Sequence, residues 1–241
     1  SMESAGLSGM PLIISGTIIT SIYIIVSPAL VTPFVKELTG KEDPGFTIGH
    51  STIGISIIGA YLGKWFGNPE TTTEDLEVPD QLQFLKEVTI STSVVMFLMY
   101  LLLWAILAVT KAPDFIAGLL ELNEAYFLYA LTKGLTFGAG MTVLLTGVRM
   151  MLDEIIPAFR GVAKKLIPGA IPALDCPMIF PYAPNAVTIG FVVSLVTSVI
   201  TIFVFGLAQY SWVLLPLVVA CFFDVGPAAV LANATGGVRG A

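Results

Sequence analysis

Long apolar stretches recur along this chain and constrain its fold more than any other feature. A helix needs about 20 mostly apolar residues to cross the hydrocarbon core of a bilayer. That length is reached, with at most one charged residue in each case, by the segments 5–31, 88–109, 125–148 and 186–207. Only 12% of the 241 residues are charged, whereas a soluble domain carries about 25%. The sequence therefore predicts an all-α polytopic membrane protein.

Two shorter apolar segments complete this fold class. The segment 48–66 is rich in glycine and marginal in length, so it is either a short span or a re-entrant half-helix. The segment 211–223 is too short to span the membrane comfortably before the sequence Asp224-Val-Gly-Pro interrupts it. Irregular backbone at membrane depth is tolerated only where protein or a water-filled site satisfies its polar groups. We therefore expect transmembrane helices together with broken half-helices.

The distribution of lysine and arginine predicts the topology, because cytoplasmic loops carry an excess of both. By this rule residues 1–241 form one membrane core whose 64–87 and 149–165 loops face the cytoplasm. The acidic part of the 67–87 loop, residues 68–80, is expected to be a solvated connector. Apolar residues recur at helical spacing in 149–166, which predicts an amphipathic helix at the membrane interface, kinked at Pro157 and serving as a connector or a docking surface.

Two ionisable residues lie inside apolar segments that glycine and proline interrupt. His50, the only histidine, follows Gly45 and Gly49, and Asp175 lies in the proline-rich stretch 166–186. An ionisable group in hydrocarbon is costly, so such residues usually face a cavity and take part in function. Polar residues at two interrupted segments are typical of a transporter's substrate site. The N–H groups of the helix that starts after His50 could also bind a ligand oxygen there, beside the Ser51 hydroxyl.

Structural roles remain possible for each of these polar positions. His50 could be satisfied by a carbonyl inside the bundle, and Asp175 could pair with Arg149 or a lysine. Asp224, at the third interruption, is equally compatible with a structural cap and with a site. Asn185 lies between Pro184 and Ala186 and resembles a helix N-cap.

Several other functions are excluded by what the sequence lacks. It has no basic stripe, so nucleic acid is not an expected partner. The two cysteines, Cys176 and Cys221, are isolated in apolar surroundings and fit small buried hydrophobes better than metal ligands. A lone histidine cannot supply a metal cluster, and no plausible Ser/His/Asp set is present. We therefore expect no metal, no cofactor and no catalysis by this chain.

Short motifs in order along almost the whole chain resemble the membrane permease (IIC component) of the bacterial ascorbate-type phosphotransferase system. They are GFTIGH at 45–50, TEDLEVP at 73–79, GVRM at 147–150, LIPGA at 166–170, LDC at 174–176, APNAV at 183–187, VLAN at 230–233 and GGVR at 236–239. The related galactitol permeases are less similar. The resemblance implies a homodimeric helical permease of the bacterial inner membrane that moves its substrate between the two membrane faces.

The resemblance also implies substrate, partners and site residues. The substrate would be L-ascorbate or a related sugar acid or polyol, phosphorylated during uptake by a soluble IIB protein that bears a phosphocysteine, with IIA as a further partner. The family's site histidine and aspartate correspond to His50 and Asp175. His50, Ser51 and Asp175 would hydrogen-bond substrate hydroxyls or an enolate oxygen, with Asp224 as a further candidate.

This sequence departs from the ascorbate pattern at two positions. Ser51 stands where ascorbate members have glutamine, and Glu3 and Ser4 are the nearest counterparts of a second site glutamine that precedes an Ala-Gly-Leu. Without the carboxamides of these two glutamines, the site offers a substrate different hydrogen-bond donors and acceptors, so the identity of the substrate stays open. The family extends beyond both ends of this sequence, which is expected to be its middle portion. An uncoupled transporter of the same fold and a non-transporting membrane fragment remain alternatives.

Overall fold

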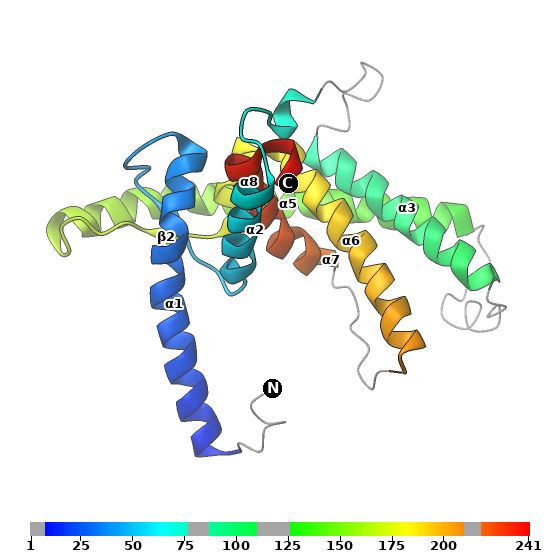
Figure 1. Ribbon diagram of the computed structural model, residues 1–241, viewed down its shortest axis with the longest axis horizontal. Coiled ribbons are helices and arrows are strands. Elements are labelled where there is room, and N and C mark those ends of the chain that lie inside the picture. Colours follow the sequence, from blue (N-terminus) through cyan, green and yellow to red (C-terminus); the bar gives the residue numbers. More distant parts are fainter. Residues whose placement is uncertain (1–7, 77–86, 110–125, 210–217) are drawn as a thin grey trace. The chain divides into compact units, whose positions relative to one another are not determined.

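The computed structural model describes residues 8–76, 87–109, 126–209 and 218–241, and these are almost entirely helical (Figure 1). The helices and strands are α1 Met10–Thr39, β1 Thr47–Ile48, α2 Ile53–Phe66, α3 Val88–Val109, α5 Tyr126–Lys165, β2 Ala173–Leu174, α6 Pro184–Leu207, α7 Val218–Ala220 and α8 Gly226–Gly236. They fall into two compact units, Ser1–Asp75 with Glu154–Ala241, and Leu76–Asp153. Each unit is described by itself below.

Helices long and apolar enough to cross a membrane confirm the predicted fold class. Within the described ranges there are four of them by length and composition, namely Met10–Thr39, Tyr126–Phe159, Pro184–Phe205 and Val218–Arg239. The predicted span 88–109 has the same bounds as α3. Helix α6 begins two residues before the predicted span 186–207 and ends at the same residue. Long charge-free runs therefore located these helices well.

The predicted end of the first span, at residue 31, is wrong. Helix α1 continues through Pro28 and Pro33 and ends at Thr39, where Gly40 adopts a left-handed conformation. Proline removes a backbone donor and normally breaks a helix. Helix α1 nevertheless stays helical past both prolines. Within this stretch the hydroxyls of Thr32 and Thr47 donate to the carbonyl of Pro28, at 2.7 and 3.3 Å.

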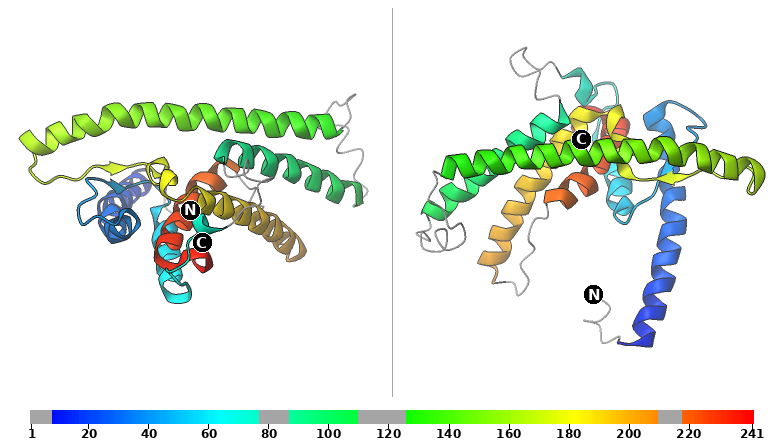
Figure 2. Two further views of the ribbon diagram at one scale, coloured as in Figure 1. Left: turned by 90° about the horizontal axis from the view of Figure 1, so that it is seen from above. Right: turned by 180° about the vertical axis from the view of Figure 1, so that it is seen from behind.

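The predicted span 125–148 and the predicted amphipathic helix 149–166 belong to one helix, α5, which runs without interruption through Pro157 (Figure 2). Residues 149–156 contain neither glycine nor proline, and most are good helix formers, so nothing stops the helix between the two segments. The location of residues 149–166 at a membrane interface stays a prediction.

In the unit Leu76–Asp153, α3 packs against the first part of α5 through small residues. A Cβ added to Gly134 would lie 2.7 Å from the carbonyl oxygen of Ser93, and one added to Gly138 would meet the same serine. The helices are antiparallel, since Thr142 bonds to Thr89 (3.1 Å) near one end of the contact. The small-xxx-small pair Gly134/Gly138 thus permits the close approach that the sequence indicates.

In the other unit, α2 and α8 form the packed centre and run side by side in parallel (Figure 1). A Cβ on Gly59 would lie 3.1 Å from the carbonyl oxygen of Ala228, and four residues later Gly63 meets the carbonyl of Ala232. The buried hydroxyl of Thr235 donates to the carbonyl of Ala60 at 2.8 Å. Helices α1 and α6 pack against this pair. The parallel arrangement brings the beginnings of α2 and α8 to the same end of the unit.

The predicted interruption of the helix at Asp224 is also wrong. Helices α7 and α8 are joined by a π-helical turn, Cys221–Val225, so the backbone stays helical past Pro227. A π-turn inserts one extra residue and is frequent at functional sites. Here it widens the helix just before the proline, which lies in the first turn of α8. The result is a helix bulge that carries Asp224.

Part of the acidic loop is buried, which contradicts its prediction as a solvated connector. Thr73 is fully buried, and its backbone N–H donates to the side chain of Asn233 at 2.9 Å. The carboxylate of Glu74 accepts from the backbone N–H of Asn185 at 2.8 Å, at the start of α6. Asn185 is therefore not the N-cap; its side chain donates to the carbonyl of Thr73 instead. Residues 77–86 of the loop lie outside the described residues.

Candidate functional site

A two-stranded parallel ladder joins the two interrupted segments. Strand β1 pairs with β2 so that Thr47 lies opposite Ala173 and Ile48 opposite Leu174. The N–H of Thr47 donates to the carbonyl of Pro172 (2.9 Å), and the N–H of Gly49 donates to that of Leu174 (2.8 Å). Because the strands are parallel, the residues that follow them leave the ladder at the same end. His50 and Asp175 are therefore brought together from distant parts of the sequence.

The imidazole of His50 contacts the N-cap residue of α2, Thr52. The hydroxyl of Thr52 lies 2.9 Å from His50 Nδ1 and donates to the carboxylate of Asp224 at 2.8 Å. Thr52 occupies the N-cap position of α2 but makes no capping bond with its side chain. The hydroxyl instead connects the histidine to the π-helical turn before α8. Three residues from the starts of two parallel helices thus form one hydrogen-bonded chain.

The start of α2 does not offer free N–H groups to a ligand, so that expectation is wrong. The N–H of Gly54 donates to the hydroxyl oxygen of Tyr23 on α1 at 3.0 Å. The N–H of Ile55 donates to the carbonyl of Thr52, and that of Ile53 to the carbonyl of His50. The chain itself uses the donors of this first turn, because α1 packs against it. Side chains therefore have to supply the polar contacts of any ligand.

Asp175 is exposed in the structure, and the contact that its carboxylate makes is with the backbone. Its oxygen accepts from the N–H of Cys176 at 2.8 Å and caps the short 3-10 helix Cys176–Met178. The partner is thus a backbone amide rather than a basic side chain. The carboxylates of Asp175 and Asp224 both lie close enough to the His50 ring to interact with it electrostatically. An acid that is accessible beside a histidine suits ligand binding.

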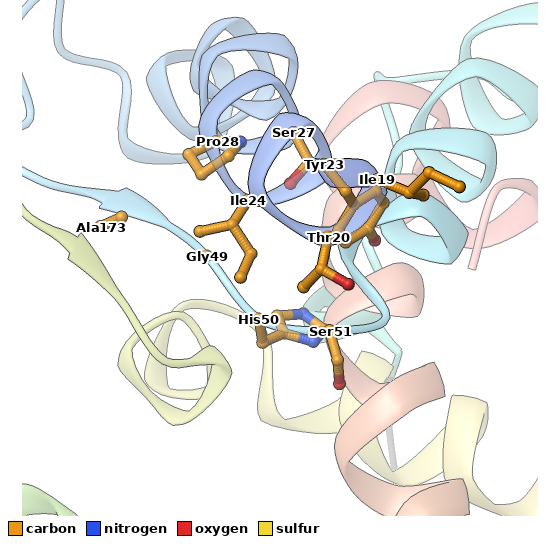
Figure 3. A pocket seen from close by; sticks show the side chains of 10 residues that line it. All are labelled: Ile19, Thr20, Tyr23, Ile24, Ser27, Pro28, Gly49, His50, Ser51 and Ala173. Atoms are coloured by element: carbon orange, nitrogen blue, oxygen red, sulfur yellow. The ribbon is translucent and has the colours of Figure 1, made fainter. Parts of the chain in front are cut away.

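A cavity of about 570 Å³ lies between α1 and the segment that carries His50 (Figure 3). Its volume falls in the range of about 300–1,000 Å³ that is usual for ligand pockets. The lining residues are Ile19, Thr20, Tyr23, Ile24, Ser27, Pro28, Gly49, His50, Ser51 and Ala173. Among the described residues the lining includes neither Asp175 nor Asp224, although both carboxylates lie near His50, which does line it. The cavity combines an apolar wall with an imidazole and several hydroxyls.

One buried polar atom at this cavity, Nε2 of His50, has no hydrogen-bond partner among the described residues. Burying a polar group without a hydrogen bond costs about 1–3 kcal/mol. This nitrogen is therefore suited to receive a ligand. Ser27, a residue that is 5% exposed, lines the same cavity with its hydroxyl group.

Sequence reasoning missed the contribution of α1 to this site. Thr20, Tyr23 and Ser27 are polar residues within a predicted span, spaced so that they share one face of a helix. That spacing is the signal that could have identified them. Thr52 was visible as a hydroxyl next to His50, but its bond to Asp224 could not be anticipated. Ser51 is exposed and lines the cavity, whereas Glu3 lies outside the described residues.

Within the part of the chain that the structure describes, no cluster of three or more histidine, cysteine or acidic side chains forms a metal site. Cys176 and Cys221 are both buried and reduced. What this site offers to a ligand is therefore hydrogen bonding and apolar contact.

Comparison with known proteins gives two results. The model of the family described as "PTS system sugar-specific permease component" matches residues 1–241. An ascorbate-specific PTS system EIIC component from Mycoplasma pneumoniae is 27% identical over 223 residues, which cover 83% of this chain and 34% of that protein. The chain thus spans about a third of the length of this curated relative.

Proposed function

We propose that this chain, which belongs to the family of PTS system sugar-specific permease components, forms the part of a permease that binds L-ascorbate or a related sugar acid or polyol. The permeases of this family are transport components, not catalytic enzymes. The observation that carries the proposal is the ladder between β1 and β2, which joins two interrupted segments beside a cavity. Interrupted helices that meet at a polar cavity are the usual form of a transporter's substrate site.

In this proposal the cavity between α1 and His50 receives the substrate. His50, Ser51 and Ser27 provide hydrogen bonds for hydroxyl groups, and Ile19 and Ile24 contact the carbon skeleton. Asp175, near His50, accepts from a further hydroxyl. Hydrogen bonds to a carboxylate are among the stronger ones, contributing about 1.5–3 kcal/mol. A small molecule with several hydroxyl groups matches this set better than an apolar one does.

Ascorbate is proposed as the first substrate to test because a relative that is 27% identical carries that specificity in its name. Coupling is proposed on the same basis: a soluble IIB protein would phosphorylate the substrate during uptake, with IIA supplying the phosphoryl group. A homodimer in the bacterial inner membrane would be the working form. Ser51 and Glu3 differ from the ascorbate pattern, so a related polyol remains within the proposal.

Uptake of radiolabelled L-ascorbate by cells that express the permease with its partners tests the binding site. His50→Ala and Asp175→Asn should each abolish uptake, while immunoblots of the membrane fraction show unchanged amounts of protein. Thr201→Val, on α6, is a matched control, because its hydroxyl bonds only within its own helix. Wild-type uptake in both site variants would remove the assignment.

The same cells test the coupling. Phosphorylated ascorbate should accumulate inside cells that contain IIB and IIA, and uptake should stop when either partner is deleted. Uptake of unmodified substrate without the partners would favour an uncoupled transporter of the same fold. If purified protein in nanodiscs bound neither ascorbate nor polyols, a non-transporting fragment would be the better interpretation.

A further inference from the structure

The hydrogen-bonded chain His50–Thr52–Asp224 constrains where the imidazole carries its proton. A threonine hydroxyl has one proton to donate, and an ionised carboxylate can only accept. Thr52 lies 2.8 Å from the carboxylate oxygen of Asp224 and therefore gives its proton to Asp224. The same hydroxyl lies 2.9 Å from His50 Nδ1, and its oxygen can then only accept from that nitrogen. In a neutral ring, Nδ1 is then the protonated nitrogen.

A second contact argues for the opposite arrangement, but it is weaker. The backbone N–H of Thr52 lies 3.3 Å from Nδ1 and would need that nitrogen as an acceptor. Nδ1 cannot accept from the amide and donate to the hydroxyl at once. At 3.3 Å this N–H···N contact is longer than the two contacts of the Thr52 hydroxyl, at 2.9 and 2.8 Å. The two bonds of the Thr52 hydroxyl, to Nδ1 and to the charged carboxylate of Asp224, are shorter and therefore stronger than the contact of the amide.

We infer that Asp224 is a positioning residue that acts through Thr52 to keep the proton of His50 on Nδ1, so that Nε2 is a bare acceptor for a hydroxyl group of the substrate. This inference rests on the proposed function for the identity of the ligand, but not for the state of the ring. Nε2 is buried and has no partner among the described residues, as expected for an acceptor reserved for a ligand. A ligand hydroxyl would donate its proton to Nε2. A carboxylate or enolate oxygen has no proton to donate, so its lone pair would face the lone pair of Nε2.

Asp224 lies in a helix bulge that contacts the start of α2. The π-helical turn Cys221–Val225 shifts the helix by one residue and places Asp224 against the start of α2. The tautomer of a histidine is set by the hydrogen bond of its other nitrogen. Here that bond is supplied by a neighbouring helix, so the packing of α2 on α8 determines what His50 can recognise.

The single histidine of the chain allows a direct test. With ¹⁵N-histidine the purified protein in lipid nanodiscs gives ring resonances for His50, identified by their loss in His50→Ala, whose chemical shifts report which nitrogen carries the proton. Wild-type protein should show the proton on Nδ1. Asp224→Ala should move it to Nε2, because the freed Thr52 hydroxyl then donates to Nδ1. Asp224→Asn should keep it on Nδ1, because the amide oxygen still accepts from Thr52.

Ligand binding provides the second measurement. Affinity for L-ascorbate should fall roughly tenfold in Asp224→Ala, the effect of one lost oriented hydrogen bond, and stay near wild type in Asp224→Asn and in the control Thr201→Val. Added ascorbate should shift the Nε2 resonance while the proton remains on Nδ1. A proton on Nε2 in wild-type protein, or spectra that Asp224→Ala leaves unchanged, would overturn the inference. Failure of ascorbate to bind at all would count against the proposed substrate, while the spectrum without ligand still decides the tautomer.

Discussion

Gly49 lies so close to Ala173 that a Cβ added to the glycine would stand 3.0 Å from the Cβ of the alanine. The same added atom would stand 3.3 Å from Cγ of Pro28 on α1. Three segments, α1, β1 and β2, thus meet at one position directly before His50. The position of the histidine depends on how closely these segments approach.

Substituting this glycine should therefore weaken ligand binding. Gly49→Ala forces a methyl group between β1 and β2, and overpacking of this kind typically costs about 1–3 kcal/mol. Part of that cost should appear as lower affinity for ascorbate, measured by titration of the protein in nanodiscs. The double variant Gly49→Ala with Ala173→Gly removes the opposing methyl group and should recover most of the affinity. Gly147→Ala, which meets nothing within 4 Å, is the control; equal losses in both single variants would contradict the proposed role of the contact.

Ser27 should affect binding without supporting the fold. Ser27 lines the cavity, so Ser27→Ala removes a polar group from the cavity wall and should leave thermal stability unchanged or higher. Affinity should nevertheless fall about 3- to 10-fold, as expected for one lost hydrogen bond of about 0.5–1.5 kcal/mol. Ser21→Ala, an exposed serine on the same helix, should change neither quantity. Lower stability with unchanged affinity would assign Ser27 a structural role instead.

Glu74 should stabilise the start of α6. Its carboxylate accepts from the N–H of Asn185 in the first turn, and a lost N-terminal cap costs about 1 kcal/mol. Glu74→Ala should lower the melting temperature and speed hydrogen exchange at the start of α6. Glu74→Gln, which retains an acceptor oxygen, should have a smaller effect. Glu70→Ala, an exposed acid in the same loop, provides the comparison; if it destabilised the protein as much as Glu74→Ala, the cap would not be the cause.

Close packing of α3 on α5 should depend on two glycines but not on a third. Gly134→Ala and Gly138→Ala place a methyl group against Ser93, and each should destabilise the unit Leu76–Asp153 by about 1–3 kcal/mol. Gly140→Ala meets nothing within 4 Å and should be neutral or stabilising, since alanine favours a helix over glycine. Urea titration of the detergent-solubilised variants would measure the differences. Similar destabilisation by all three substitutions would indicate that helix flexibility, rather than packing, matters.

The spans were predictable because their signal is local. A charge-free run such as 88–109 carries its own evidence for a helix, and α3 has those bounds. Some of the predictions that proved wrong concern interruptions: α1 continues through Pro33, and the helix that includes α7 and α8 continues past Asp224. Proline and glycine indicate that a helix can break, but the local backbone, such as the π-turn before Pro227, decides whether it does.

Residue type and spacing were enough to predict the membrane-spanning character of the chain and its family, and to mark His50 and Asp175 as unusual. These features do not depend on long-range contacts. The three-dimensional structure was needed to show that β1 pairs with β2, that Thr52 links His50 to Asp224, and that α1 forms a wall of the cavity. These relationships join residues far apart in the chain, and the register of helix packing and strand pairing, on which they depend, cannot be read from any local pattern.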